Sequence, residues 1–308
     1  MFRWPLEGVI PALVTPFGED ERIDYGAWQA IVDALIAAGV DGLLVGGSTG
    51  EFCSINEEER IVALRFCCQA AAGRVPVYGN IGCISTRATV RLARQAEAEG
   101  VDFLVAVTPY YLKPSPEELA EHYVEICRAS HLPVLAYRIP MFTGVDFAPH
   151  AARLIAAQCE NFVGLKDSSG DFAGVPGYVH AVPGRRLSVF MGNDNVLLPA
   201  LEAGAAGVMS GGANIAPQLF IDMYRAFRQG RREEAVRLQE LASSLEKTYA
   251  LGTFPAAIKE AMRMVGLPAG PCRKPVRPLA AEAREKLAAV LDRLREENYL
   301  PTAHSAAW

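Results

Sequence analysis

The stretch NFVGLKDSSG, at residues 161–170, joins a short apolar run to a lysine. Phe162, Val163 and Leu165 predict a buried β-strand, because aromatic and β-branched residues bounded by turn formers are typical of strands. Lys166 stands at the end of that strand. Burying an amine as a cation costs free energy unless a partner compensates it. The position of Lys166 therefore has to be explained either by a structural ion pair or by chemistry.

Similar apolar runs recur along the chain and alternate with longer amphipathic segments. Alternating strands and helices favour a parallel sheet covered by helices, and eight repeats favour a (β/α)8 barrel of the TIM type. A doubly wound sheet, the alternative, would carry a glycine-rich dinucleotide fingerprint after its first strand, which VTPFGEDERI at 14–23 lacks. The predicted strands are 8–16, 42–47, 75–80, 102–109, 133–140, 162–169, 187–194 and 207–212.

Strand signals stop after residue 215, and the rest of the chain reads as helical. We expect the first of these helices to close the barrel, and the others to form a helical appendage suited to packing or assembly. The predicted division is a catalytic barrel over 1–230 and a helical extension over 231–308, with a frayed tail over 301–308. The predicted late helices are 216–230, 231–252, 254–266 and 279–298.

The composition excludes several classes of partner. The chain has 308 residues, 51% of them hydrophobic, and a formal net charge of -5 without a basic block, which argues against nucleic acid. The first residues lack the pattern of a signal peptide, and no apolar run approaches the ~18 residues of a membrane span. The seven cysteines show no metal-ligand spacing. We therefore predict a cytoplasmic protein with reduced thiols, no metal and no membrane partner.

Polar side chains gather at the predicted strand ends, where a barrel collects its reactive groups. Capping of the following helices explains a serine or threonine there equally well. It does not explain Lys166 or Tyr137, which lie within apolar strand ends. The strand-end residues are Thr15, Ser48, Thr49, Asn80, Thr108, Tyr110, Tyr111, Tyr137, Lys166, Ser168, Asp194 and Ser210.

Lys166 and Tyr137 end neighbouring strands and can act together. Burial favours the neutral form of an amine, which attacks a ketone to form an imine. The imine then serves as an electron sink for a neighbouring C–C bond, and a phenol can relay the protons. The structural alternatives are a lysine paired with Asp167 or another buried carboxylate, and a core tyrosine with a satisfied hydroxyl.

Two loops could complete such a site. In GGSTGE, at 46–51, glycines allow a sharp turn, and the N–H groups and hydroxyls around Ser48 and Thr49 can cradle an anion. The motif is not a P-loop, because no lysine follows its last glycine, and a carboxylate fits as well as a phosphate. Alternatively, it is a turn leading to a helix cap near Asn56. TPYY, at 108–111, places two phenols at a corner, either for packing or for the site.

Six motifs occur in order at successive strand ends, and together they carry a resemblance. The set resembles the dihydrodipicolinate synthase/N-acetylneuraminate lyase superfamily of pyruvate-dependent class I aldolases, over about residues 5 to 295. The resemblance implies a (β/α)8 barrel with C-terminal helices, usually a homotetramer (a dimer of dimers), and no metal or organic cofactor. The motifs are GGSTGE (46–51), TPYY (108–111), YRIPMFTG (137–144), GLKDSSGD (164–171), GNDN (192–195) and GVMSGGAN (207–214).

The resemblance also implies residue roles. Lys166 would form the Schiff base with pyruvate or another 2-oxo acid, and Tyr137 would donate and accept protons. Ser48 and Thr49 would hold the substrate carboxylate, and Ser48 would link Tyr137 to Tyr111, a phenol usually contributed across a subunit boundary. The remaining substrate-binding positions would be Gly47, Ser168, Gly192, Asp194, Ser210, Gly211 and Phe142.

Positions at which the sequence differs from the family motifs narrow the range of substrates that we expect. Synthases of the superfamily carry an arginine where this chain has Phe142, so a bidentate contact to the second substrate's carboxylate is lost. Strand alternation points Arg138 to the opposite face, so it cannot replace that contact. Asn195 stands where neuraminate lyases carry a glutamate, and Gly211 stands where they carry a hydroxyl. Asp194 can still bind a polyol.

We therefore predict a Schiff-base lyase, an aldolase or dehydratase, acting on pyruvate and a 2-keto-3-deoxy sugar acid or related 4-hydroxy-2-oxo acid. One alternative is 4-hydroxy-tetrahydrodipicolinate (dihydrodipicolinate) synthase, which condenses pyruvate with aspartate semialdehyde. A second is a non-catalytic barrel that binds sugar acids, which would have no need of an imine lysine. A third is a phosphate-handling barrel isomerase, for which no glutamate base stands at a strand end.

Overall fold

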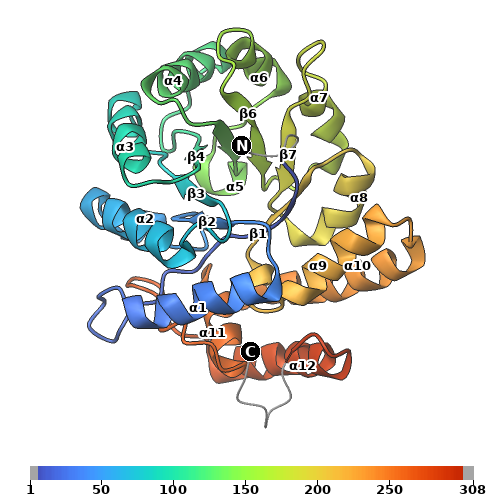
Figure 1. The fold of residues 1–308 in the computed structure, drawn as a ribbon. Coiled ribbons are helices and arrows are strands. Elements are labelled where there is room, and N and C mark those ends of the chain that lie inside the picture. The colour runs from blue at the N-terminus through green and yellow to red at the C-terminus, as the bar shows by residue number, and fades with distance from the viewer. Residues whose placement is uncertain (1–5, 301–308) are drawn as a thin grey trace.

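The computed structural model describes residues 6–300 and contains a ring of eight parallel strands surrounded by helices (Figure 1). Hydrogen-bonded neighbours follow the order β1-β8-β7-β6-β5-β4-β3-β2, and a parallel bridge from Ala12 to Leu44 joins the two ends of the sheet. The predicted (β/α)8 barrel is confirmed. The strands are β1 (Gly8–Pro11), β2 (Leu43–Val45), β3 (Val77–Asn80), β4 (Phe103–Val107), β5 (Val134–Arg138), β6 (Phe162–Asp167), β7 (Ser188–Met191) and β8 (Gly207–Ser210).

All eight strands start where the sequence predicts, within two residues, but several end earlier. Beyond the bridge from Ala12 to Leu44 the backbone leaves the sheet, and Val14 donates its N–H to the side chain of Asn214 (3.2 Å). Beyond Ser210, Gly212 donates its N–H to the Asp194 carboxylate (3.1 Å). In these two segments, N–H groups that the prediction assigns to the sheet bind side chains instead.

Helices follow the strands around the ring, where the sequence predicts amphipathic segments. Asn56 and Ser115 begin two of them with complete capping boxes, in which cap and third residue exchange hydrogen bonds. The short α5 (Pro140–Thr143) and α7 (Val175–Val179) were not predicted, because they are too short for a periodic pattern. The others around the barrel are α1 (Tyr25–Ala38), α2 (Glu57–Ala71), α3 (Thr86–Ala98), α4 (Pro116–Ala129), α6 (Pro149–Ala156), α8 (Leu197–Glu202) and α9 (Pro217–Arg228).

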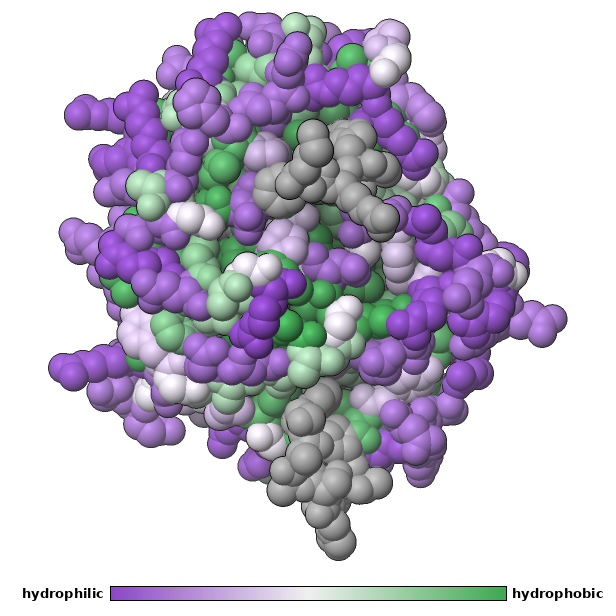
Figure 2. All heavy atoms as spheres, in the orientation of Figure 1, coloured by the Kyte–Doolittle hydropathy of each residue, from purple (hydrophilic) through white to green (hydrophobic). Residues whose placement is uncertain are grey.

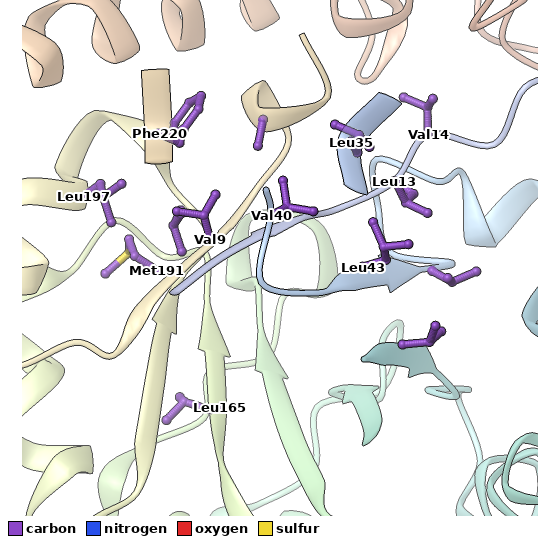
Figure 3. Close-up of a cluster of buried hydrophobic side chains, with 14 of the residues drawn as sticks. Val9, Leu13, Val14, Leu35, Val40, Leu43, Leu165, Met191, Leu197 and Phe220 are labelled. Atoms are coloured by element: carbon purple, nitrogen blue, oxygen red, sulfur yellow. The ribbon is translucent and has the colours of Figure 1, made fainter. Parts of the chain in front are cut away.

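Strand alternation divides the buried apolar residues into two layers. One layer lies between strands and helices, and Figure 3 shows part of it, with Val9, Leu165 and Met191 among the labelled side chains. The other fills the barrel and includes Ile10 and Phe190. Polar residues cover the outer helices, whereas apolar residues gather towards the middle of the ring in Figure 2. Because Leu165 faces the helix layer, Lys166 faces the barrel interior.

The helical extension consists of α10 (Arg232–Lys247), α11 (Ala256–Met264) and α12 (Ala281–Glu296), with a 3-10 turn, η5 (Thr248–Leu251), after α10. In Figure 1 it lies beside α1 and α9. The predicted tail at 301–308 lies outside the described residues. No helix within residues 6–300 is long and apolar enough to cross a membrane. All seven cysteines are free thiols, and the described residues contain no cluster of acidic, histidine or cysteine side chains able to hold a metal.

A buried ion pair fastens the extension to the barrel. Lys259 on α11 donates to Glu51 at the end of the GGSTGE loop (Nζ to Oε1, 2.6 Å) and to the Pro271 carbonyl (2.7 Å). Both charged side chains are 2% exposed. The backbone N–H of Arg273 donates to the other Glu51 oxygen (2.9 Å). The pair therefore holds one loop of the barrel against two segments of the extension.

We predict that Lys259→Met destabilises the protein by about 3–5 kcal/mol, because it leaves the Glu51 carboxylate buried without its countercharge. Chemical denaturation followed by circular dichroism measures the change. Lys286→Ala, which removes an exposed pair with Glu282 on α12, is the control and should cost less than about 1 kcal/mol. Equal effects of the two variants would contradict the proposed role of the buried pair.

Candidate active site

A cavity of about 320 Å³ lies where several barrel strands end, and Lys166 is among its lining residues. It contains most of the residues that the sequence singles out. Gly47, Ser210 and Tyr111 do not line it. The predicted residues that do are Ser48, Thr49, Tyr137, Phe142, Lys166, Ser168, Gly192, Asp194 and Gly211.

Lys166 is buried beside Tyr137 with no countercharge in reach. The two residues are register partners on β6 and β5; Lys166 is 3% exposed, and its Nζ lies 4.3 Å from the centre of the Tyr137 ring. Asp167 points to the other side of the strand, where Arg138 donates to it (2.9 Å). Within residues 6–300, Lys166 has no acidic partner at ion-pair distance, so the structural pairing with Asp167 is ruled out.

Tyr137 is connected to the GGSTGE loop. Its hydroxyl lies 3.3 Å from Ser48 Oγ, and either atom can donate. A buried phenol next to an amine and a second hydroxyl is placed to pass protons between substrate and loop. Arg138, one residue further, binds Asp146, Asp167 and Ser169 outside the barrel interior, as strand alternation predicts.

The GGSTGE loop has free backbone donors. Within residues 6–300, the N–H groups of Ser48 and Thr49 have no acceptor. The loop around them is held rigidly: Thr15 donates to the Gly50 carbonyl (2.7 Å) and Asn80 donates to the Gly46 carbonyl (2.6 Å). Free donors in a fixed loop, lining the same cavity as Lys166, form an anion site.

Gly192 makes room for the lysine. A Cβ atom at this position would lie 2.0 Å from Ser168 Oγ and 2.8 Å from Lys166 Cε. Any larger residue would therefore displace both side chains. Gly192, the glycine of GNDN, therefore leaves room for Lys166 just after the end of β7, because it has no side chain.

The far wall of the cavity is acidic. Asp194 is 1% exposed, and its Oδ2 accepts from the Gly212 N–H (3.1 Å) and the Tyr249 hydroxyl (3.1 Å). Burial raises the pKa of Asp194, against smaller effects of its hydrogen bonds and of Lys166. Ser210 lies behind this wall, where its Oγ accepts from the Ala213 N–H (3.0 Å).

The extension supplies five lining residues that the sequence did not reveal: Glu246, Lys247, Tyr249, Ala250 and Phe254. Glu246 accepts from the Asn195 N–H (2.5 Å), and burial, then the charge of Asp194, raises its pKa. The sequence shows only that these residues follow the barrel, in a segment without a motif, so nothing in it marks them as site residues. The predicted appendage therefore also forms part of the site.

Aromatic rings occupy the mouth of the cavity. Phe142, 55% exposed, lies 5.7 Å from Phe254 between ring centres. Tyr111 is 91% exposed and does not line this cavity, and its backbone is left-handed (φ 74°). Its neighbour Tyr110 packs edge-on against Phe52 (6.0 Å between ring centres). Within one protomer, the structure does not bring Tyr111 to Tyr137.

A buried lysine that lies beside a phenol at the strand ends of a barrel is typical of the Schiff-base aldolases. Residues 5–294 match the Dihydrodipicolinate synthetase family. The chain belongs to this family of pyruvate-dependent class I aldolases.

Relatives within the family carry different names. The chain is 37% identical to the probable 2-dehydro-3-deoxy-D-pentonate aldolase YjhH of Escherichia coli over 288 residues, covering 92% of this chain and 96% of that protein. It is 36% identical to 4-hydroxy-tetrahydrodipicolinate synthase 1 of Halalkalibacterium halodurans, covering 91% and 94%.

Solved structures share the whole fold. YagE of Escherichia coli, a prophage protein of the family solved in complex with pyruvate, superposes with a TM-score of 0.90 at 32% identity, covering 94% of this chain and 99% of that one. Dihydrodipicolinate synthase from Acinetobacter baumannii, also complexed with pyruvate, gives a TM-score of 0.89 at 30% identity, covering 96% and 99%.

We predict that Gly192→Ala abolishes trapping of pyruvate on Lys166 while the protein stays folded, because the new methyl group occupies the space of Lys166 Cε. Borohydride reduction followed by mass spectrometry measures the adduct. Gly26→Ala is the control, since a Cβ there has only an ordinary contact at 3.5 Å. Normal adduct formation by Gly192→Ala would show that the lysine tolerates displacement.

Proposed function

We propose that this protein is an aldolase that cleaves, or makes, a 2-keto-3-deoxy sugar acid through an imine at Lys166. The observation that supports the proposal is the buried Lys166, which forms no ion pair among residues 6–300 and lies against the ring of Tyr137, whose hydroxyl contacts Ser48. Such a lysine has no structural partner to explain it, and its neighbours match the needs of imine chemistry.

The cleavage reaction follows from the geometry. The free N–H groups of Ser48 and Thr49 bind the substrate carboxylate, which directs the C2 ketone towards Lys166. The Lys166 amine adds to C2, and water leaves as the imine forms, with Tyr137 relaying the protons.

Bond cleavage uses the protonated imine as the electron sink. Tyr137 takes the proton of the C4 hydroxyl, the C3–C4 bond breaks, and its electron pair enters the imine to give an enamine. An aldehyde leaves from C4 onward. Protonation of the enamine at C3 and addition of water at C2 then release pyruvate and restore the Lys166 amine.

The cavity favours a sugar acid over the substrate of the synthases. Phe142 stands where the synthases of the superfamily carry an arginine, and its ring lies against Phe254 at the mouth of the cavity. The acidic wall offers acceptors for hydroxyl groups. The name of the relative YjhH points to the same substrate class, whereas the name of the relative from Halalkalibacterium halodurans points to synthesis of the dipicolinate precursor.

We predict pyruvate release from at least one acid in a panel of 2-keto-3-deoxy pentonates and hexonates, monitored with lactate dehydrogenase. Lys166→Ala should show no release and no borohydride-trapped pyruvate, whereas Lys286→Ala on the exposed face of α12 should behave as wild type. Turnover of aspartate semialdehyde with pyruvate at rates above those for every sugar acid would instead identify a synthase. Failure of wild type to trap any 2-oxo acid would refute imine chemistry.

We also propose a homotetramer, a dimer of dimers, in which Tyr111 completes the site of a neighbouring subunit. Its 91% exposure in one protomer and its distance from the cavity support contribution to another chain. Leu112, also exposed, extends an apolar surface that association would cover.

Subunit mixing tests this assignment. Tyr111→Phe and Lys166→Ala proteins should each be nearly inactive, and co-refolding should restore part of the activity, because the Lys166→Ala subunit supplies Tyr111 to the intact lysine of its neighbour. Sedimentation measures the assembly of each variant. An unchanged rate for Tyr111→Phe, or a mixture without regained activity, would contradict a role in trans.

A further inference from the structure

A second carboxylate of the cavity comes from outside the barrel. Glu246 lies in the last turn of α10, and it lines the same cavity as Lys166 although 80 positions separate the two in the sequence. Its Oε2 accepts from the backbone N–H of Asn195 (2.5 Å), which fixes the carboxylate at the end of β7. A carboxylate has about four acceptor positions, so this contact leaves capacity towards the cavity.

Glu246 is more accessible than the acid beside it. Asp194 is almost completely buried, and its Oδ2 already receives two hydrogen bonds, from Gly212 and Tyr249. The Ser210 hydroxyl lies close enough to lower the Asp194 pKa but makes no well-aligned bond to Oδ1, which is enclosed without a partner among residues 6–300. Glu246 is half-buried, so of the two acids it is the one that a substrate in the cavity meets.

The charge of this wall selects against anions. Asp194 and Glu246 are flanked by the neutral amides of Asn193 and Asn195. The cations that line the cavity are Lys166, which is bound covalently to pyruvate during the reaction, and Lys247, which is exposed to solvent. An aldehyde ending in a carboxylate would therefore face a pair of acids that holds at least one negative charge near neutral pH, because burial and the charge of Asp194 raise the pKa of Glu246 without neutralising both groups.

We propose that Glu246 is a specificity-determining residue that binds a hydroxyl group of the aldehyde portion of the substrate, so that the enzyme prefers neutral hydroxyaldehydes over carboxylate-terminated ones. Asp194 and Tyr249, which are hydrogen-bonded to each other, form the part of the cavity wall beside Glu246. The inference rests on the proposed aldolase function. It adds the chemical class of the second substrate and the residue that binds it.

The test compares three aldehydes in condensation with pyruvate: D-glyceraldehyde, propionaldehyde, which has the same carbon chain without hydroxyls, and succinic semialdehyde, which ends in a carboxylate. Wild type should prefer D-glyceraldehyde by kcat/KM. Glu246→Gln keeps the size of the side chain and an acceptor for the Asn195 N–H. Assayed at about pH 9, above the Glu246 pKa that burial and the charge of Asp194 raise to about 8, it should lower kcat/KM for D-glyceraldehyde about 10- to 100-fold, mainly through KM, because a charge-assisted hydrogen bond is lost.

The same substitution should change kcat/KM for propionaldehyde by less than about threefold, since no hydroxyl is there to bind. It should leave succinic semialdehyde unchanged or improved. Glu240→Gln, on the same helix but exposed, is the matched control and should leave all three values as in wild type. Borohydride trapping of pyruvate should be normal in both variants.

Three outcomes would overturn the proposal while leaving the imine chemistry intact. They are an equal loss for D-glyceraldehyde and propionaldehyde in Glu246→Gln, a wild-type preference for succinic semialdehyde, and no wild-type turnover of D-glyceraldehyde despite normal trapping. Loss of pyruvate trapping in Glu246→Gln would assign the residue a structural role and would also overturn it. Absence of trapping in wild type would instead refute the proposed function itself.

Discussion

Three consecutive side chains of β6 have three separate environments, and the site depends on their alternation. Leu165 packs among the helices, Lys166 enters the barrel, and Asp167 turns outward to Arg138. Because side chains of a strand alternate strictly, a slip of one residue would exchange the lysine for a carboxylate inside the barrel. Register with β5 and β7 prevents this, since Lys166 pairs with Tyr137 on one side and Phe190 on the other.

The loop that faces Lys166 depends on a different kind of constraint. The Ser48 and Thr49 donors are useful only if they stay in place when no anion is bound. Glu51, at the end of the same loop, is anchored by Lys259 from α11 and by the backbone of Arg273. A buried ion pair of this type adds little net stability but favours one arrangement over others. The extension therefore preorganises the carboxylate site.

Much of the fold and the reactive half of the site could be predicted from local pattern. Eight apolar runs with alternating helices predicted the barrel, and the ends of two neighbouring strands brought Lys166 and Tyr137 together, since parallel strands end at one face. Strand ends were overestimated, because apolar residues continue past the point where the chain leaves the sheet, as at Val14. Tyr111 could not be placed, because the role proposed for it concerns a second chain.

Asp194 was predicted as part of the site, but its partner Glu246 could not be, for a further reason. Glu246 carries no motif, and its approach to Asn195 arises from the packing of α10 against the barrel, which is a long-range contact. Nothing in a helical segment with several glutamates distinguishes the one that faces a cavity. A pattern of period 3.6 identifies a helix face, but not what that face meets.

The origin of the cavity residues has a consequence for how this scaffold can change. The groups proposed to form the imine belong to the strands, whereas Glu246, Tyr249 and Phe254 belong to the segment after the barrel. Under the proposed function, substitutions confined to 246–254 therefore alter which carbonyl compound is accepted without disturbing bond making and breaking. Laboratory evolution of new stereochemistry or chain-length preference would start from a library of those nine positions. The residues at the strand ends would stay unchanged.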